Sequence, residues 1–208
     1  IMVDEAGGVT KQVIEFRNMI QRRGVDVVIG YISSGSCLGI APVAEEMKVL
    51  TIFHTCGTPR IFEEGNYRYV FRTASHSAMD GIGAARYLID RFPDLKTYAG
   101  INQNYAWGHD SWRDFEGALR ILKPDLQFKT HQLPKLFAGQ YNAEISALLV
   151  SRSEAIHSSL FGGDLEAFTF QATARGLHKT TKLILTTGET MMFQLATQLP
   201  AGLILGAR

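Results

Sequence analysis

The chain has 208 residues, which is enough for one large domain or two small ones. Its 21 lysines and arginines nearly balance its 20 aspartates and glutamates, so the formal net charge is +1. That balance argues against a dedicated nucleic-acid or membrane-surface binder, which would carry a basic stripe. No apolar run reaches the roughly 18 residues that a membrane-spanning helix needs.

Short apolar runs alternate with amphipathic stretches along the chain. The first amphipathic stretch covers residues 9–20, where apolar side chains recur at spacings of 4, 3 and 4, as on one face of a helix. Apolar runs that predict strands cover residues 25–32, 49–53, 67–71, 97–101, 126–132, 155–161, 182–185 and 203–205. Further helices are predicted at residues 38–47, 82–92, 112–122 and 145–149. Because the runs are nearly all apolar, we expect strands that are covered on both faces.

This alternation predicts right-handed βαβ units, and therefore an α/β fold with doubly wound parallel sheets. Irregular stretches at 55–67 and 72–77 interrupt it, and we place a domain boundary near residue 74. The predicted domains are residues 1–74 and 75–208. Because the first predicted element is a helix rather than a strand, we expect the chain to be a fragment whose first domain is incomplete.

A polar loop follows the first predicted strand. Residues 30–36 read Gly-Tyr-Ile-Ser-Ser-Gly-Ser and precede a predicted helix. Ligands of open α/β sheets bind at the carboxyl ends of strands, where a helix N-terminus offers free N–H groups. Ser34, Gly35 and Ser36 are therefore candidates for holding a carboxylate or another small anion. The alternative is an ordinary helix cap, which serines form routinely.

A second loop is expected to leave the sheet at the same edge. Residues 54–59, His-Thr-Cys-Gly-Thr-Pro, follow the strand predicted at 49–53. Cys56, Gly57 and Thr58 would share a ligand with the serine loop, unless this is an ordinary β-to-α connection. The sequence leaves open whether Cys37 and Cys56 are free thiols or form a disulfide.

Polar and aromatic side chains follow three later strands. Tyr105 and Trp107 lie among polar residues, a combination that suits a ligand with apolar and polar parts, or that simply covers the sheet. Gly163, Asp164 and Glu189 also follow predicted strands. Asp164 would cap its helix or face the cleft, and Glu189 would pair with a ligand ammonium group. Alternatively, each acid is a first-turn charge that complements a helix dipole.

The sequence also allows a catalytic alternative. Residues 35–39, Gly-Ser-Cys-Leu-Gly, match a nucleophile elbow with Cys37 as nucleophile, and an α/β hydrolase would add Asp164 and His178. His178 lies in a basic turn before a strand, which suits a triad poorly. The six histidines show no metal-ligand spacing, and no phosphate-binding Gly-Lys-Ser/Thr occurs. We expect no enzyme activity, no metal and no cofactor.

An ordered set of motifs spans essentially the whole chain. These motifs are Asp-Val-Val-Ile-Gly at 26–30, Ser-Ser-Gly-Ser at 33–36, Tyr-Arg-Tyr-Val-Phe-Arg-Thr at 67–73, Asn-Tyr-Ala-Trp-Gly at 104–108, Phe-Gly-Gly at 161–163 and Pro-Ala-Gly-Leu-Ile at 200–204. Together they resemble the branched-chain amino-acid-binding family of type I periplasmic binding proteins, the substrate-binding proteins of ABC transporters.

The resemblance implies two α/β lobes joined by a hinge, with a small ligand between them. The ligand would bear a carboxylate, as in an amino acid or an aromatic acid, although relatives also bind amides. The partner would be the permease of an ABC importer, and the protein would be an extracytoplasmic, periplasmic monomer that binds no nucleic acid. The family usually has further lobe-one sequence before Ile1 and after Arg208. A ligand-sensing receptor domain is the other alternative, because signalling proteins use the same fold.

The resemblance also places ligand contacts on individual residues of this chain. These are Ser34, Gly35, Ser36, Cys56, Gly57, Thr58, Tyr105, Trp107, Gly163, Asp164 and Glu189. The serine loop would hold the carboxylate, the aromatic pair would close over the ligand, and the acids would lie near its amino group or side chain. Two positions depart from the family pattern, because Asn104 replaces a common Asp and Cys56 replaces a small residue such as alanine.

Overall fold

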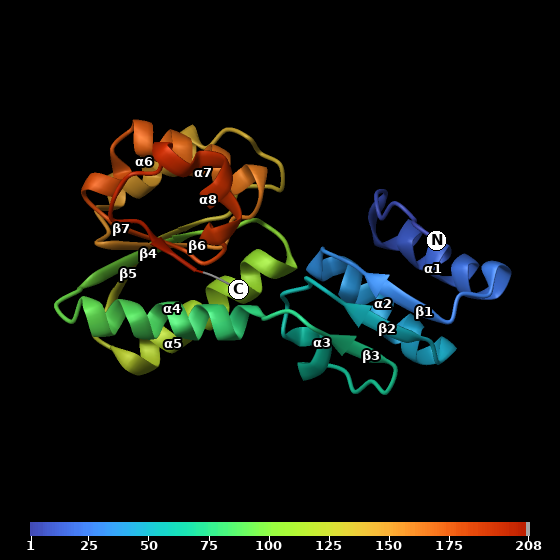
Figure 1. Ribbon diagram of the computed structural model, residues 1–208. Helices are drawn as coiled ribbons and strands as arrows, with labels where there is room; N and C mark the ends of the chain where they lie inside the picture. Colours follow the sequence, from blue (N-terminus) through green and yellow to red (C-terminus); the bar gives the residue numbers. More distant parts are fainter. Residues whose placement is uncertain (207–208) are drawn as a thin grey trace. The chain divides into compact units, whose positions relative to one another are not determined.

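The computed structural model describes residues 1–206, which form two compact units. Unit 1 is Ile1–His76, and unit 2 begins at Ser77. Each unit contains a parallel β-sheet with helices packed against it (Figure 1). This confirms the predicted α/β class with parallel sheets. No helix among the described residues is both long enough and apolar enough to cross a lipid bilayer.

Unit 1 holds a three-stranded sheet in the order β1-β2-β3. Its elements are α1 Gly8–Arg23, β1 Val27–Gly30, α2 Ser34–Met47, β2 Leu50–Phe53, α3 Arg60–Glu63 and β3 Val70–Arg72. Phe16 of α1, Ile40 of α2 and Phe53 of β2 are fully buried in one core. An ion pair of 2.6 Å between Arg17 and Glu46 also joins α1 to α2. The amphipathic spacing predicted for residues 9–20 thus forms the helix that covers this core.

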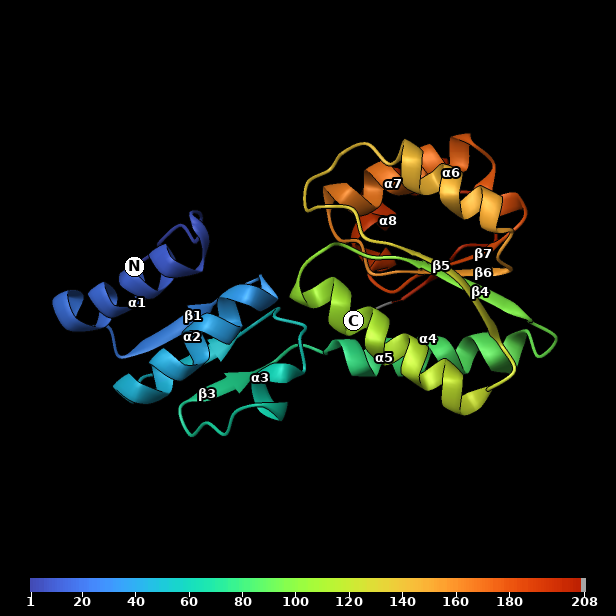
Figure 2. The ribbon, with the colours of Figure 1, turned by 180° about the vertical axis from the view of Figure 1, so that it is seen from behind.

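Unit 2 holds a five-stranded sheet in the order β5-β4-β6-β7-β8. Its helices are α4 Ser77–Arg91, α5 Ala106–Leu122, α6 Asn142–Ser151, α7 Gly163–Ala174 and α8 Met192–Leu195. Its strands are β4 Thr97–Ile101, β5 Gln127–Gln132, β6 Ala155–Ser158, β7 Lys182–Leu185 and β8 Ile204–Leu205. Helices α4 and α5 cover one face, whereas α6, α7 and α8 cover the other (Figures 1 and 2).

Alternation along β4 shows how the sheet of unit 2 serves two cores. Tyr98 packs on the α4–α5 side with Trp112 and Phe115. Ala99 and Ile101 belong to the opposite core, which contains Phe168 of α7, among others. Successive side chains of a strand point to opposite faces, so a strand covered by helices on both sides is apolar throughout.

The expectation that the strands are covered on both faces is wrong for β1, β3 and β5. Each of them lies at an edge of its sheet in the described part of the chain. Ile29 of β1 remains 70% exposed, Phe71 of β3 remains 52% exposed, and the polar residues of β5 are at best half-buried. An apolar run predicts a strand, but its place within the sheet depends on partners that are distant in the sequence.

Candidate functional site

The two polar loops of unit 1 leave its sheet at the same level. Strands β1 and β2 pair in parallel, and their last residues, Gly30 and Phe53, are register partners. The loop from β1 leads into α2, whose N-cap is Ser33, and the loop from β2 leads into α3. The sheet therefore brings the predicted serine loop beside the predicted Cys56–Thr58 loop, as adjacent parallel strands require.

Hydrogen bonds connect these two loops directly. The backbone N–H of Thr58 donates to Oγ of Ser34, at 3.2 Å. The Thr58 hydroxyl accepts a hydrogen bond from the N–H of Arg60 at 3.2 Å, which caps the turn into α3. Ser34 is 2% exposed, Ser36 is 3% exposed and Thr58 is fully buried. The hydroxyls thus form a buried polar cluster at the N-terminus of α2, where the helix dipole favours an anion.

The structure contains a disulfide between Cys37 and Cys56, a pairing that the sequence left open. Cys37 lies in the first turns of α2, and Cys56 lies in the loop after β2, with 6.3 Å between their Cα atoms. Both side chains are fully buried. A disulfide sulfur is not a thiolate nucleophile. The pairing therefore removes the basis for the hydrolase alternative, which required a free thiol at Cys37.

Arg72 supports the Cys56–Thr58 loop from β3. Its Nη1 donates to the carbonyl oxygen of Thr58 at 2.6 Å and to that of Cys56 at 3.3 Å. The guanidinium also lies 5.5 Å from the ring centroid of Phe62. Desolvation by burial lowers the pKa of Arg72, and the charge of Glu63 opposes that shift. Arg72 was not predicted as a site residue, although it lies within the motif at 67–73.

In unit 2, three adjacent strands also end at one level. The last residue of β4, Ile101, is the register partner of Ser158, the last residue of β6. Ser158 is in turn the register partner of Leu185, the last residue of β7. The chain passes from β4 to β5 on one side and reaches β6 on the other, so β4 marks a topological switch point. Ligands of open α/β sheets bind at such points, outside the carboxyl ends of the strands.

Asn102 joins the first two loops at this edge of unit 2. Its Oδ1 accepts hydrogen bonds from the N–H of Ser159 at 2.9 Å and from the Ser159 hydroxyl at 2.7 Å. Its Nδ2 lies 3.0 Å from Nε2 of His131. The indole N–H of Trp107 donates to the carbonyl oxygen of Ser159 at 2.8 Å. Trp107 is only 4% exposed, so its ring lies inside unit 2 and supports the Ser159 loop.

Asp164 is the buried carboxylate of this edge, at 5% exposure. Its Oδ2 accepts hydrogen bonds from Nε2 of Gln103 at 2.6 Å and from the backbone N–H of Phe137 at 2.8 Å. Burial and then the Asp164 carboxylate raise the pKa of Tyr141. The residues Gln103 and Phe137 were not predicted, because loops that are distant in the sequence bring them to Asp164.

The remaining predicted residues lie on neighbouring loops of unit 2. Tyr105 is the N-cap of α5 and is half-buried. Gly163 is exposed and begins α7. Glu189 is half-buried in the turn Gly188–Met191, and its N–H donates to the carbonyl of Gly206 at 3.1 Å. Asn104, where the family often has an Asp, is exposed and accepts from Nε2 of His109 at 2.9 Å.

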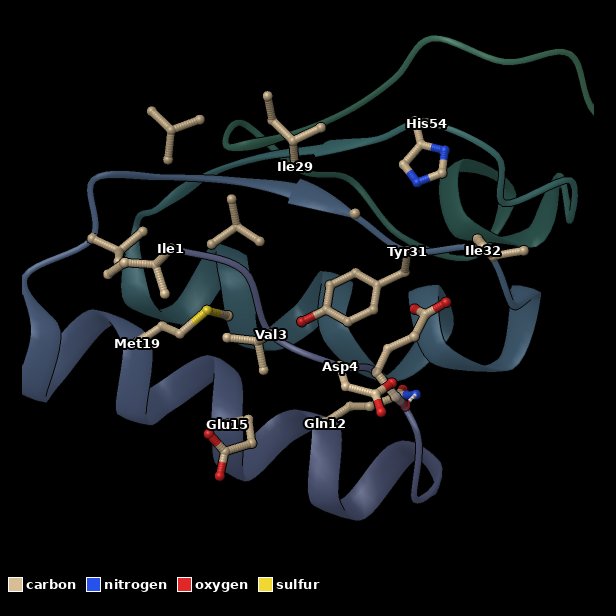
Figure 3. Close-up of a pocket in the computed structure, with 15 residues that line it drawn as sticks. Ile1, Val3, Asp4, Gln12, Glu15, Met19, Ile29, Tyr31, Ile32 and His54 are labelled. Atoms are coloured by element: carbon tan, nitrogen blue, oxygen red, sulfur yellow. Dashed lines mark hydrogen bonds between the residues drawn. The ribbon is translucent and has the colours of Figure 1, made fainter.

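A cavity of about 470 Å³ lies along β1 in unit 1, and Tyr31, Ile32 and His54 from the first residues of the two polar loops are among those that line it (Figure 3). Figure 3 shows Tyr31, Val3, Gln12 and Met19 around it, with Ile29 at the strand. Burial, followed by the charge of Glu5, raises the pKa of Tyr31 to about 12. None of the predicted ligand residues lines this cavity.

Comparison with known proteins shows the family of this chain. Residues 1–207 match the protein family described as periplasmic binding protein. The chain is 27% identical over 172 residues to the leucine-, isoleucine-, valine-, threonine- and alanine-binding protein of Pseudomonas aeruginosa. It is 26% identical over 171 residues to the leucine-specific-binding protein of Salmonella typhimurium. Each alignment covers 80% of this chain and 44% of the relative, so the chain spans less than half the length of these relatives.

Solved structures of solute-binding proteins share the fold. One from Rhodopseudomonas palustris BisB5, in complex with 3,4-dihydroxybenzoic acid, has a TM-score of 0.83 at 22% identity, covering 97% of this chain and 54% of that one. An amino acid ABC transporter substrate-binding protein from Pseudomonas fluorescens Pf-5 has a TM-score of 0.85 at 17% identity, covering 98% and 54%. The resemblance carried by the loop motifs is thus confirmed, and the chain belongs to the periplasmic binding protein family.

Proposed function

We propose that this chain is a solute-binding protein of an ABC importer and that it captures a small carboxylate-bearing molecule outside the cytoplasm. The observation that carries the proposal is the polar cluster at the carboxyl edge of unit 1. There, Ser34, Ser36 and Thr58 lie at a helix N-terminus, and Arg72 supplies a positive charge behind the loop. Such an arrangement favours a small anion over a neutral solute.

Unit 2 would supply complementary contacts. Asp164 and Glu189 are acids on loops of its carboxyl edge, and both suit a solute ammonium group. Tyr105 and Gly163 are further contacts in this proposal, whereas Trp107 acts through the Ser159 loop that it supports. The partner would be an importer permease, and we expect the binding protein to be monomeric.

Two solute classes follow from the relatives. The curated relatives are named for leucine and similar amino acids, and the Rhodopseudomonas structures contain benzoic acids. Both classes have a carboxylate joined to an apolar group. Leucine adds an ammonium group, for which Asp164 and Glu189 are suited, whereas a benzoate does not need these acids.

Thermal-shift measurements with matched probe pairs test the proposal. The probes are leucine with leucinamide and benzoate with benzamide, because each pair differs at the carboxylate. We expect a carboxylate probe to raise the melting temperature increasingly with concentration, by the equivalent of about 2.7 kcal/mol at 100 times its Kd. We expect Ser34→Ala to weaken this response, and Thr10→Ala on the exposed face of α1 to leave it unchanged.

A flat response to every probe would contradict the proposed function. Ester hydrolysis that disappears in Cys37→Ser would instead favour the hydrolase, although the disulfide at Cys37 argues against that result.

A further inference from the structure

Arg72 reaches the backbone of a predicted ligand loop from the neighbouring strand. It is the last residue of β3 and the register partner of Phe53, the last residue of β2. The loop from β2 begins at the next residue, so the sheet places the guanidinium beside Cys56–Thr58. One nitrogen, Nη1, then donates to the carbonyl oxygens of both Cys56 and Thr58.

The restraints on this loop include three that differ in charge. The disulfide fixes Cys56 to α2, and the Ser34 hydroxyl accepts the Thr58 N–H. Both restraints are neutral. Arg72 is the cationic member of the set, and a guanidinium stays protonated at physiological pH. The ring of Phe62 beside it and the half-buried surroundings reduce the screening of its charge by water.

The two hydrogen bonds from Arg72 affect which backbone groups face a solute. Carbonyl oxygens repel a carboxylate, and Arg72 donates hydrogen bonds to two of them in this loop, those of Cys56 and Thr58. A hydrogen bond to the Cys56 carbonyl also polarises the Cys56–Gly57 peptide, which strengthens the Gly57 N–H as a donor. The Gly57 N–H is thereby strengthened as a donor to an anion, while the carbonyl oxygens of Cys56 and Thr58 accept hydrogen bonds from the guanidinium.

We propose that Arg72 is a positioning residue that gives the Cys56–Thr58 loop its preference for a carboxylate over a neutral amide. This inference rests on the proposed function, since it concerns the same solute. Arg72 acts on the solute through the loop, by orienting and polarising its backbone, and without direct contact. A residue that only stabilised unit 1 would affect carboxylate and amide binding equally.

Isothermal titration calorimetry with the two matched probe pairs tests this role. The measured quantity is the ratio of carboxylate to amide affinity, for benzoate over benzamide and for leucine over leucinamide. We expect Arg72→Gln and Arg72→Met to lower this ratio about tenfold, which is the size expected when a charge-assisted hydrogen bond is lost. Arg72→Lys keeps the positive charge but loses the planar guanidinium over Phe62, and it should retain part of the ratio.

Arg68→Met is the matched control, because Arg68 is an exposed arginine that precedes β3 in the same unit. It removes the same charge from unit 1 and should leave the ratio unchanged. Circular dichroism and the melting temperature show which variants are folded.

The outcomes separate the two claims. If the wild-type protein binds none of the probes, the proposed function fails, and this inference fails with it. If the wild type binds a carboxylate probe and a folded Arg72→Gln or Arg72→Met keeps the full ratio, only the role of Arg72 is wrong. The inference is also overturned if neither neutral variant folds, because Arg72 is then required for the structure of unit 1.

Discussion

His157 shows how a single ionisable residue is accommodated in the core of unit 2. It lies on β6, its side chain is 1% exposed, and its ring stacks on Phe115 with 4.2 Å between centroids. Neither ring nitrogen has a hydrogen-bond partner among the described residues. Desolvation, followed by the charge of His131, lowers the pKa of His157 to about 3. The ring is therefore neutral at pH 7 and packs as an apolar side chain.

This burial predicts that the stability of unit 2 falls in acid. The unfolded chain binds a proton at His157 near pH 6.5, whereas the folded state resists protonation until about pH 3. The stabilisation is complete above about pH 6.5 and is lost progressively as the pH falls. His131, whose pKa burial lowers to about 4, adds a loss in the same range.

Urea unfolding of His157→Phe between pH 7 and pH 4 measures the contribution of this residue. The variant keeps an aromatic ring and removes the titrating group. We expect its unfolding free energy to fall less steeply with decreasing pH, by about 1.4 kcal/mol per pH unit at most. The control Thr10→Ala, on the exposed face of α1, should leave the slope unchanged. Equal slopes in His157→Phe and the wild type would show that His157 does not contribute to acid unfolding.

At the scale of elements, helix α5 begins in close contact with the loop that precedes it. A Cβ atom on Gly108 would lie 1.9 Å from the carbonyl oxygen of Gln103, which is a backbone atom that cannot simply rotate away. The same loop carries Asn102 and Gln103, which hold Ser159 and Asp164. The glycine thus lets the helix approach the loop that organises the carboxyl edge of unit 2.

Two alanine substitutions in α5 test this contact. Gly108→Ala should destabilise unit 2 by about 2 to 3 kcal/mol, because the added methyl group forces the helix and the loop apart. Gly117→Ala is the matched control, since a Cβ there meets nothing within 4 Å. It should stabilise the helix by up to about 1 kcal/mol. Chemical denaturation measures the free energy of unfolding of both variants. A change of the same sign in both would show that the close approach at Gly108 does not require a glycine.

The sequence predicted residues 112–122 of α5, but it predicted neither the first turns of the helix, which begins at Ala106, nor the need for a glycine at 108. The spacing of Trp112, Phe115, Leu119 and Leu122 is local, and it identifies a helix that covers one face of the sheet. The close approach of Gly108 to Gln103 depends on how the chain turns back at the end of β4, which periodicity does not report.

For the whole molecule, the same division between local and long-range information applies. Each of the eight apolar runs forms a strand, because strand formation follows from local composition. The loop motifs identified the family, because they lie in order along the chain. The sequence did not predict three features: the Cys37–Cys56 disulfide, the Arg72 contacts and the exposed edge strands such as β1 and β5. Each of these depends on which strands become neighbours.

Backbone-amide NMR during titration with benzoate or leucine shows whether the carboxyl-edge loops bind a carboxylate. We expect saturable shifts at Ser36, at Gly57 and at Asp164, while the amides of β5 and of the exposed face of α4 remain unchanged. Leucinamide and benzamide should produce weaker shifts at Gly57 than the matching carboxylates. Saturable shifts that instead cluster around the cavity along β1, with Ser36 and Gly57 unaffected, would show that the solute does not bind at the carboxyl-edge loops.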